Sequence, residues 1–186
     1  NWTSYNTSNS GLVDNTVLAI TIDYQDNKWF ATSDGVSKFD GTNWTTYDTS
    51  NSRLAYNFVA AIAIDSSGNK WFGGGLYLSK FDGIHWTTFY IPDGPYVVHN
   101  VYAIAVDASD NIWVGTLIDV RMLEGINWTI YNTSNSGLAG GDVHAIALDK
   151  SDNKWFGTCY GACYGGVCKF DGTNWTIYNT SNSGLL

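Results

Sequence analysis

Six residues whose side chains could bind a ligand lie where the internal repeats of this sequence are interrupted. Two interruptions are segments, YIPDGPYVVHN at residues 90–100 and CYGACYGGVC at residues 159–168, and the third is an arginine in place of the glycine of a recurrent NSGL. Charged groups form strong hydrogen bonds, and aromatic rings stack on flat ligands. Departures from a repeat are where a binding site can be added to a scaffold, although drift in exposed loops is the alternative. The candidate ligand-binding residues are Arg53, Asp93, Tyr96, His99, Tyr160 and Tyr164.

Patterns for catalysis and for metal binding are missing from the sequence. The three histidines, His85, His99 and His144, have no ligand-like spacing, and there is no G-x-S-x-G motif or phosphate-binding glycine loop. The recurrent Asp-rich turns lack the alternating oxygen ligands and the closing glutamate of a calcium loop. Only two arginines occur, which disfavours a sialidase-like carboxylate site. We therefore expect a non-enzymatic protein with no metal and no cofactor.

Composition restricts the partners further. The 186 residues carry a net charge of −8 with nine Lys and Arg, so a nucleic-acid backbone is not an expected partner. No run approaches the ~20 apolar residues of a membrane-spanning helix, so membrane insertion is not expected either. Because the chain begins with Asn1 inside a repeat, we expect a processed chain or a piece of a longer one.

One twelve-residue phrase dominates the sequence and sets its period. It reads NWTSYNTSNSGL from Asn1, NWTTYDTSNSRL from Asn43 and NWTIYNTSNSGL from both Asn127 and Asn174, with a degraded copy, HWTTFYIPDGPY, from His85. The first four copies of its tryptophan are 42 residues apart and the last follows after 47. Each period also contains three further strand-like segments, exemplified by VLAITID, NKWFAT and VSKFDG, joined by Asp, Asn and Gly turns. Four short antiparallel strands in a unit of about 40 residues predict an all-β protein, a β-propeller of four-stranded blades.

The best-preserved period carries a family resemblance. AIAIDSSGNKWFGG followed by LSKFDGIHWTTF resembles the two-component-regulator propeller repeat, and the similarity extends over essentially the whole chain. The third unit departs most, with Leu123-Glu124-Gly125 where the others have FDG. The resemblance implies an extracellular or cell-surface propeller, or a periplasmic one, that senses a glycan or protein ligand.

The repeat count leaves one outer strand over. The units are residues 13–54, 55–96, 97–138 and 139–186, preceded by residues 1–12, which form a surplus outer strand and its loop. We expect one propeller domain or an arc of a larger propeller, with Asn1 to Tyr5 paired to strands outside the four units; the alternative is a closed four-bladed ring in which one terminal copy is peripheral. Such pairing means head-to-tail self-association or continuation in a longer chain. The alternative function is accordingly a structural subunit of a surface fibre or layer, assembled by strand exchange.

Cysteines, tryptophans and sequons complete the predictions. Cys159 and Cys168 align with Ser33 and Ser37, which places them near opposite each other and predicts a disulfide, with Cys163 left over; a three-thiol metal site is less favoured. The tryptophans recur at equivalent strand positions, which favours packing between blades over sugar stacking. Candidate glycosylation sites follow the N-x-S/T pattern, although the repeat's use of Asn in turns and Thr in strands produces it by accident. They are Asn1, Asn6, Asn43, Asn127, Asn132, Asn174 and Asn179.

Overall fold

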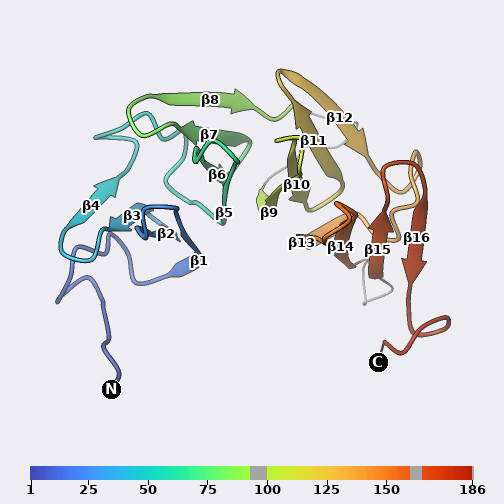
Figure 1. The fold of residues 1–186 in the computed structure, drawn as a ribbon, viewed down its shortest axis with the longest axis horizontal. Helices are drawn as coiled ribbons and strands as arrows, with labels where there is room; N and C mark the ends of the chain where they lie inside the picture. The colour runs from blue at the N-terminus through green and yellow to red at the C-terminus, as the bar shows by residue number, and fades with distance from the viewer. Residues whose placement is uncertain (93–99, 160–164, 186) are drawn as a thin grey trace. The chain divides into compact units, whose positions relative to one another are not determined.

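Sixteen β-strands form four antiparallel sheets in the computed structural model, which describes residues 1–92, 100–159 and 165–185 (Figure 1). No helix occurs among these residues, so the all-β prediction is confirmed. In each sheet the four strands follow one another in chain order as a meander, which is the blade of a β-propeller. The strands are β1 (Val17–Ile22), β2 (Lys28–Thr32), β3 (Gly35–Phe39) and β4 (Trp44–Tyr47) in blade 1; β5 (Ala61–Ile64), β6 (Lys70–Gly74), β7 (Tyr77–Phe81) and β8 (Trp86–Tyr90) in blade 2; β9 (Val101–Val106), β10 (Ile112–Thr116), β11 (Val120–Glu124) and β12 (Asn127–Tyr131) in blade 3; β13 (Asp142–Leu148), β14 (Lys154–Cys159), β15 (Gly166–Phe170) and β16 (Trp175–Tyr178) in blade 4.

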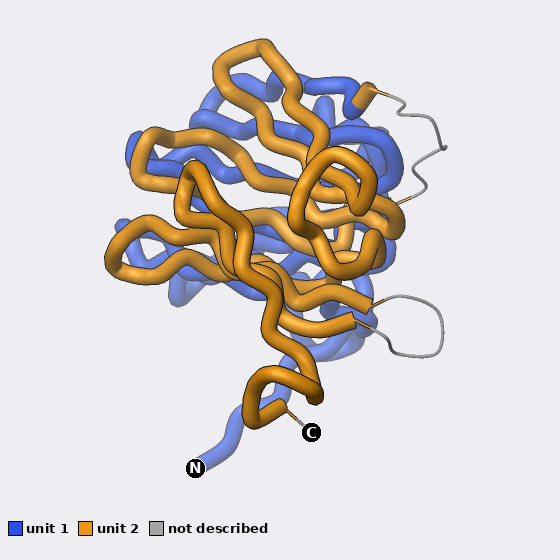
Figure 2. Tube along the Cα trace, turned by 90° about the vertical axis from the view of Figure 1, so that its right-hand side faces the viewer, with its two compact units in different colours: residues 1–91 blue, residues 92–186 orange. Residues whose placement is uncertain are grey.

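The chain divides into two compact units (Figure 2). Unit 1, Asn1–Ile91, holds blades 1 and 2, and unit 2, Pro92–Leu186, holds blades 3 and 4. The four sheets fall within the four predicted repeat units, but a closed ring or an arc stays a prediction. The described residues include no helix with the length and apolarity that crossing a membrane requires.

An aspartate closes the first hairpin of every blade. The carboxylate of Asp23 accepts hydrogen bonds from the backbone N–H groups of Gln25 (3.0 Å) and Asn27 (2.9 Å) and from the indole N–H of Trp29 (2.9 Å). The turn also needs a left-handed residue, which is Asp26 in blade 1 (φ 65°) and Gly68 in blade 2 (φ 80°). The same indole contact recurs in the other blades at 2.9–3.0 Å, from Asp65, Asp107 and Asp149. The predicted turn chemistry therefore also fixes the tryptophan of the second strand.

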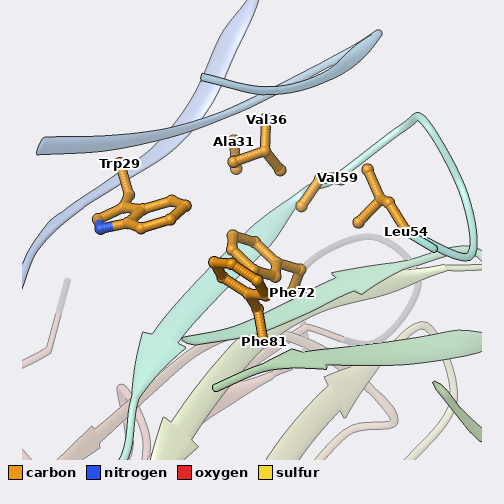
Figure 3. Packing of buried hydrophobic residues seen from close by; sticks show 7 residues of the cluster. All are labelled: Trp29, Ala31, Val36, Leu54, Val59, Phe72 and Phe81. Atoms are coloured by element: carbon orange, nitrogen blue, oxygen red, sulfur yellow. The ribbon is translucent and has the colours of Figure 1, made fainter. Parts of the chain in front are cut away.

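Each unit has its core between its two blades. In unit 1 the buried side chains of blade 1 meet those of blade 2 in one cluster (Figure 3). Trp29 lies 6.0 Å from Phe72 and 6.1 Å from Phe81, measured between ring centroids. The cluster consists of Trp29, Ala31, Val36, Leu54, Val59, Phe72 and Phe81. Its counterpart in unit 2 consists of Trp113, Val120, Leu138, Val143, Phe156 and Cys168. The second-strand tryptophans of blades 1 and 3 thus pack between blades.

The predicted surplus outer strand, residues 1–5, is not a strand in the structure. Trp2 is fully exposed, whereas Tyr5 packs on Phe39 (5.8 Å) and Trp44 (5.6 Å). The segment adds no strand to the sheet of blade 1, whose order is β1-β2-β3-β4. Pairing of Asn1 to Tyr5 outside the four units stays a prediction.

The prediction that Cys159 and Cys168 lie opposite each other on neighbouring strands is wrong. The β14–β15 register pairs Cys168 with Phe156 and Thr158 with Gly166, so Cys159 lies beyond the last paired residue of that ladder. The buried thiol of Cys168 instead accepts the backbone N–H of Ala139 at 3.1 Å, and no disulfide joins the two cysteines. Burial raises the pKa of this thiol above its ordinary value. Cys163 lies outside the described residues.

Candidate functional site

Arg53, the arginine that interrupts the repeated phrase, borders a cavity of about 690 Å³ in unit 1. This volume lies within the range of small-molecule sites, roughly 300–1,000 Å³. The loop between β4 and β5 forms one side of the cavity, and β7, β8 and their connecting turn form the other. Its lining residues are Tyr47, Ser50, Asn51, Ser52, Arg53, Phe81, Ile84, His85 and Trp86.

The loop on the first side is held at both ends by the repeat's own hydrogen bonds. Asp48 accepts the backbone N–H groups of Ser50 (2.7 Å) and Asn51 (3.0 Å), and Ser79 accepts that of Ala55 (3.0 Å). The equivalent asparagines of the other copies make the same turn, since Asn6, Asn132 and Asn179 each accept a serine N–H at 2.8–2.9 Å. This structural use of Asn also supplies three of the seven sequons, whose glycosylation stays a prediction.

Arg53 alters the contact that this loop makes with the next blade. At the equivalent positions a Cβ added to Gly11 would lie 2.2 Å from the Cβ of Trp44, and one added to Gly137 would lie 2.2 Å from the Cβ of Trp175. Such distances are far inside van der Waals contact, so only glycine lets the loop lie flat on the tryptophan. An arginine at this position cannot adopt that packing, and here Arg53 and Trp86 line a cavity together.

The apolar wall of the cavity is made of three rings. Tyr47 lies 5.5 Å from both Phe81 and Trp86, and the last two stack at 4.7 Å. Trp86 and Tyr47 are half-buried, so each keeps an exposed edge or face. Burial raises the pKa of the Tyr47 hydroxyl, which therefore stays a neutral donor and acceptor.

Charged and polar groups surround these rings. Arg53 is exposed and is joined at the rim by His85, whose Nδ1 lies 3.3 Å from Asp82. The backbone N–H groups of His85 and Ile84 hold the pKa of Asp82 below its ordinary value, so this carboxylate is ionised. Ser50, Ser52 and Asn51 contribute hydroxyl and amide groups. The arrangement can stack a flat apolar face and hydrogen-bond hydroxyl or carboxylate groups beside it.

The second arginine of the chain has a structural role. Arg121 is fully buried, and its Nε and Nη2 donate to the carboxylate of Asp119 at 2.9 Å and 2.8 Å. Its remaining terminal nitrogen donates to the backbone carbonyl of Pro92. Its guanidinium therefore binds Asp119 and the backbone at Pro92, which leaves Arg53 as the arginine that a ligand can reach.

Of the six predicted binding residues, Arg53 is the one that the structure describes. Asp93, Tyr96, His99, Tyr160 and Tyr164 lie outside the described residues, so their part in a site stays a prediction. Tyr47, Phe81, His85 and Trp86 also line the cavity and were not predicted, because the repeated aromatic residues were assigned to packing and His85 was considered only for catalysis or metal binding. The available signal was the charged residue at a repeat position that otherwise holds glycine. No cluster of metal-binding side chains is found in the described ranges.

Comparisons with known proteins agree with the architecture. Residues 96–117 match the model of the two component regulator propeller family. The extracellular domains of two hybrid two component systems of B. thetaiotaomicron are similar to the chain, at 23% and 18% identity and TM-scores of 0.75 and 0.72, over 89% and 90% of this chain. Virginiamycin B lyase of Staphylococcus aureus, in a structure with quinupristin, is similar at 15% identity and a TM-score of 0.68, over 92% of this chain and 59% of its own.

These matches establish the fold and leave the activity open. The chain spans 23% of the length of each of the two extracellular domains. Extracellular domains of two component systems and a lyase both occur among the similar structures, and a search of curated protein sequences gave no match. Residues 96–117 are thus a two component regulator propeller repeat, and the chain that contains them is built from β-propeller blades.

Proposed function

We propose that this chain is a non-enzymatic, extracytoplasmic binding module whose cavity between Arg53 and Trp86 holds an acidic carbohydrate. The observation that carries the proposal is the cavity itself, where aromatic rings, hydroxyl and amide groups and one accessible guanidinium converge. The similar extracellular domains support a sensing or interaction role outside the cytoplasm.

The chemistry of the lining selects the ligand class. The C–H face of a sugar ring packs on exposed indole or phenol, as do other apolar surfaces on aromatic rings. Sugar hydroxyls can donate to the oxygens of Ser50, Ser52 and Asn51, whose own donors are used within the loop by Asp48 and the carbonyl of Thr46. A uronic acid carboxylate would add a bidentate bond to Arg53, the strongest polar contact that the site offers. A peptide with a C-terminal or side-chain carboxylate next to an apolar residue is the protein-derived alternative.

Calorimetric titration with paired oligosaccharides tests the proposal. Galacturonic acid and glucuronic acid oligomers should bind, and neutral oligomers of the same length should bind more weakly. Arg53→Gly restores the residue of the well-preserved copies and should weaken acidic oligomers about 10-fold or more, because it removes a charged hydrogen bond worth about 1.5–3 kcal/mol and lets the loop close on Trp86. Arg53→Lys keeps the charge but loses the bidentate geometry, so it should give an intermediate loss.

Lys150→Gly is the matched control, because it removes another exposed cation, from a turn of blade 4. It should leave the affinity unchanged. Equal losses for Lys150→Gly and Arg53→Gly would reduce the effect to net charge and contradict the site. Mass spectrometry of the titrated oligomers checks the non-enzymatic part, which predicts that they are recovered intact.

A further inference from the structure

The blade interface occurs in both units with the same geometry, so it has two definable sides. One side belongs to the earlier blade and centres on its second-strand tryptophan, Trp29 or Trp113. The other side belongs to the later blade and offers two aromatic rings, Phe72 and Phe81 to Trp29, and Phe156 and Phe170 to Trp113. The ring distances are 6.0 and 6.1 Å in unit 1 and 5.9 and 6.0 Å in unit 2.

Opposite charges also meet across this interface. Lys70 of blade 2 lies 3.3 Å from Asp23 of blade 1 and 5.4 Å above the ring of Trp29. In unit 2, Lys154 of blade 4 lies 3.3 Å from Asp107 of blade 3 and 5.4 Å above the ring of Trp113. The tryptophan side therefore carries an aspartate, and the phenylalanine side carries a lysine.

Blade 4 presents a tryptophan side that no described residue of a later blade covers. Trp155 stacks on Tyr178 at 5.7 Å, as Trp29 stacks on Tyr47 at 5.8 Å, and Asp149 stands beside it. Cavities of about 250 and 320 Å³ open along this face, the first lined by Thr158 and Gly166 and the second by Trp155 and Tyr178. The equivalents of Thr158 and Gly166 in blade 1 bind the next blade, since the carbonyl of Thr32 accepts from Val59 and the N–H of Gly35 donates to Asn57.

The exposed leucine at the end of the last phrase marks the same open side. Leu54 and Leu138 close their copies of the phrase and are 4% exposed, because the next blade covers them. Leu185 closes the last copy, lines both cavities of blade 4 and is 41% exposed.

Blade 1 presents the phenylalanine side without a tryptophan to cover it. Ile20 of β1 is 61% exposed, whereas its equivalents Ile62 and Ile146 pack against the clusters of the two units. Leu18 and Ile22, on the same face of β1 as Ile20, are also exposed. Phe30 and Phe39 take the places of Phe72 and Phe81, and each stacks on Trp44, at 5.4 and 4.8 Å. Lys28 takes the place of Lys70 and, within the described part of the chain, pairs with the exposed Asp26 of its own turn.

We propose that the open face of blade 4 binds the open face of blade 1 of a second copy of this chain, head to tail. Trp155 would lie on Phe30 and Phe39 of the second copy, and Lys28 of that copy would reach Asp149, as Lys70 reaches Asp23. The interface continues one that the chain makes twice internally, with apolar surface and opposite charges on matching sides. Because its two sides differ, each copy keeps one open face and the contact propagates.

The two terminal copies of the repeated phrase, residues 1–12 and residues 174–185 of a neighbouring copy, compete for one position on blade 1. Residues 1–12 occupy the phrase position on blade 1, where Leu12 is 7% exposed and Ser37 accepts the N–H of Val13. Residues 174–185 differ from them only at Ser4 against Ile177, so they fit the same position. Head-to-tail contact therefore replaces the first copy of the phrase by the last copy of a neighbouring chain.

Sedimentation velocity of four proteins tests this geometry. The mean sedimentation coefficient of the native protein should rise with concentration beyond that of a dimer. Ile20→Asp and Leu185→Asp each place a carboxylate in one side of the contact and should weaken self-association about 10-fold or more, because an unpaired charge is costly to bury. An equimolar mixture of the two variants retains one intact pair of faces and should form a 1:1 dimer that grows no further. Ile126→Asp, at an isoleucine 84% exposed in the turn between β11 and β12, is the control and should associate like the native chain.

Removal of residues 1–12 tests the competition. The shortened chain should associate more tightly than the native one, and weaker association would contradict the exchange. A native chain that stays monomeric at all concentrations would overturn the head-to-tail contact, and so would a mixture of Ile20→Asp and Leu185→Asp that fails to dimerise. A stable dimer formed by either variant alone would show a symmetric interface and also overturn it. Circular dichroism shows whether each variant keeps the native strand content, as expected for substitutions of exposed side chains.

Discussion

Replacing Asp23 by asparagine should destabilise unit 1 through the interface between its blades. The carboxylate is buried and joins three elements: its own turn through Asn27, the core through Trp29, and blade 2 through Lys70 at 3.3 Å. Asparagine retains one acceptor for the turn. It presents an amide N–H₂ group to Trp29 and Lys70, both of which are donors. One charge-assisted hydrogen bond and one largely buried ion pair are therefore lost.

The expected loss is about 3 kcal/mol of unfolding free energy. Removing one partner of a buried ion pair costs about 3–5 kcal/mol, a figure that includes the weakened hydrogen bond of the group left behind, and the lower end applies here because the Lys70 side chain is 9% exposed and can move its charge to water. With a urea dependence of about 2 kcal/mol/M, the unfolding midpoint should fall by about 1.5 M. Urea titration followed by tryptophan fluorescence measures it.

Asp149→Asn is the matched control for this prediction. Asp149 accepts the same turn and indole hydrogen bonds, from Asn153 and Trp155, but no lysine of a later blade lies against it in the described chain. Its replacement should shift the midpoint clearly less than Asp23→Asn when both are measured at high dilution. Equal shifts for the two variants would mean that the aspartate acts only within its own turn, and the reasoning on the blade interface would fail.

Two further predictions follow from the same contacts. Burial raises the pKa of Asp107, but hydrogen bonds from Trp113 and Asn111 outweigh it, so the folded-state pKa lies below the ordinary 3.8. The stability that this carboxylate contributes is thus complete above the unfolded-state pKa and is lost as the pH falls toward the folded-state pKa. Urea midpoints should therefore be level from about pH 5 to 8 and fall below about pH 4. A midpoint that rises on acidification would contradict this direction of the pKa shift. Gly137→Ala places a Cβ 2.2 Å from that of Trp175 and should cost about 1–3 kcal/mol, whereas Gly184→Ala, at the same repeat position with nothing within 4 Å, should leave the melting temperature nearly unchanged. Equal effects of the two alanines would contradict the neighbour-dependent role of this glycine.

Strands and turns of this fold could be predicted because their signals are local. A run such as VLAITI, followed by Asp, a left-handed position and Asn, specifies a strand and its hairpin without knowledge of any other segment. The period of 42 residues then identifies the blade, and β1–β4 lie where the first unit predicts them.

Register could not be derived from the same alignment. Cys159 and Cys168 do align with Ser33 and Ser37, but Ser37 pairs with Phe30, and Cys168 likewise pairs with Phe156. Equivalence between repeats therefore does not mean proximity across strands. A one-residue difference in pairing decides which side chains meet, and the alignment carries no information about it.

The candidate site was predictable only in part, for a related reason. Arg53 stood out because it breaks the phrase, but the cavity depends on how close Trp86 comes from the next blade. That distance is a property of two segments about 30 residues apart, and no local pattern reports it. The aromatic residues of the wall also occur in every blade, so their types alone do not separate packing from binding.

The four well-preserved copies of the phrase separate the structure that the repeat sequence determines from the burial that depends on the next blade. In each copy the Asn or Asp cap accepts the same serine N–H, so the local turn belongs to the sequence. Burial of the closing leucine does not, since Leu54 is covered and Leu185 is exposed. Blade 1 keeps Leu18, Ile20 and Ile22 exposed on its open face, whereas Ile62 of blade 2 and Ile146 of blade 4 pack against the core that each of these blades shares with the preceding blade. The open face of blade 1 therefore matches the side that a neighbouring blade presents, and in the proposed head-to-tail contact blade 4 of a second copy would supply that side.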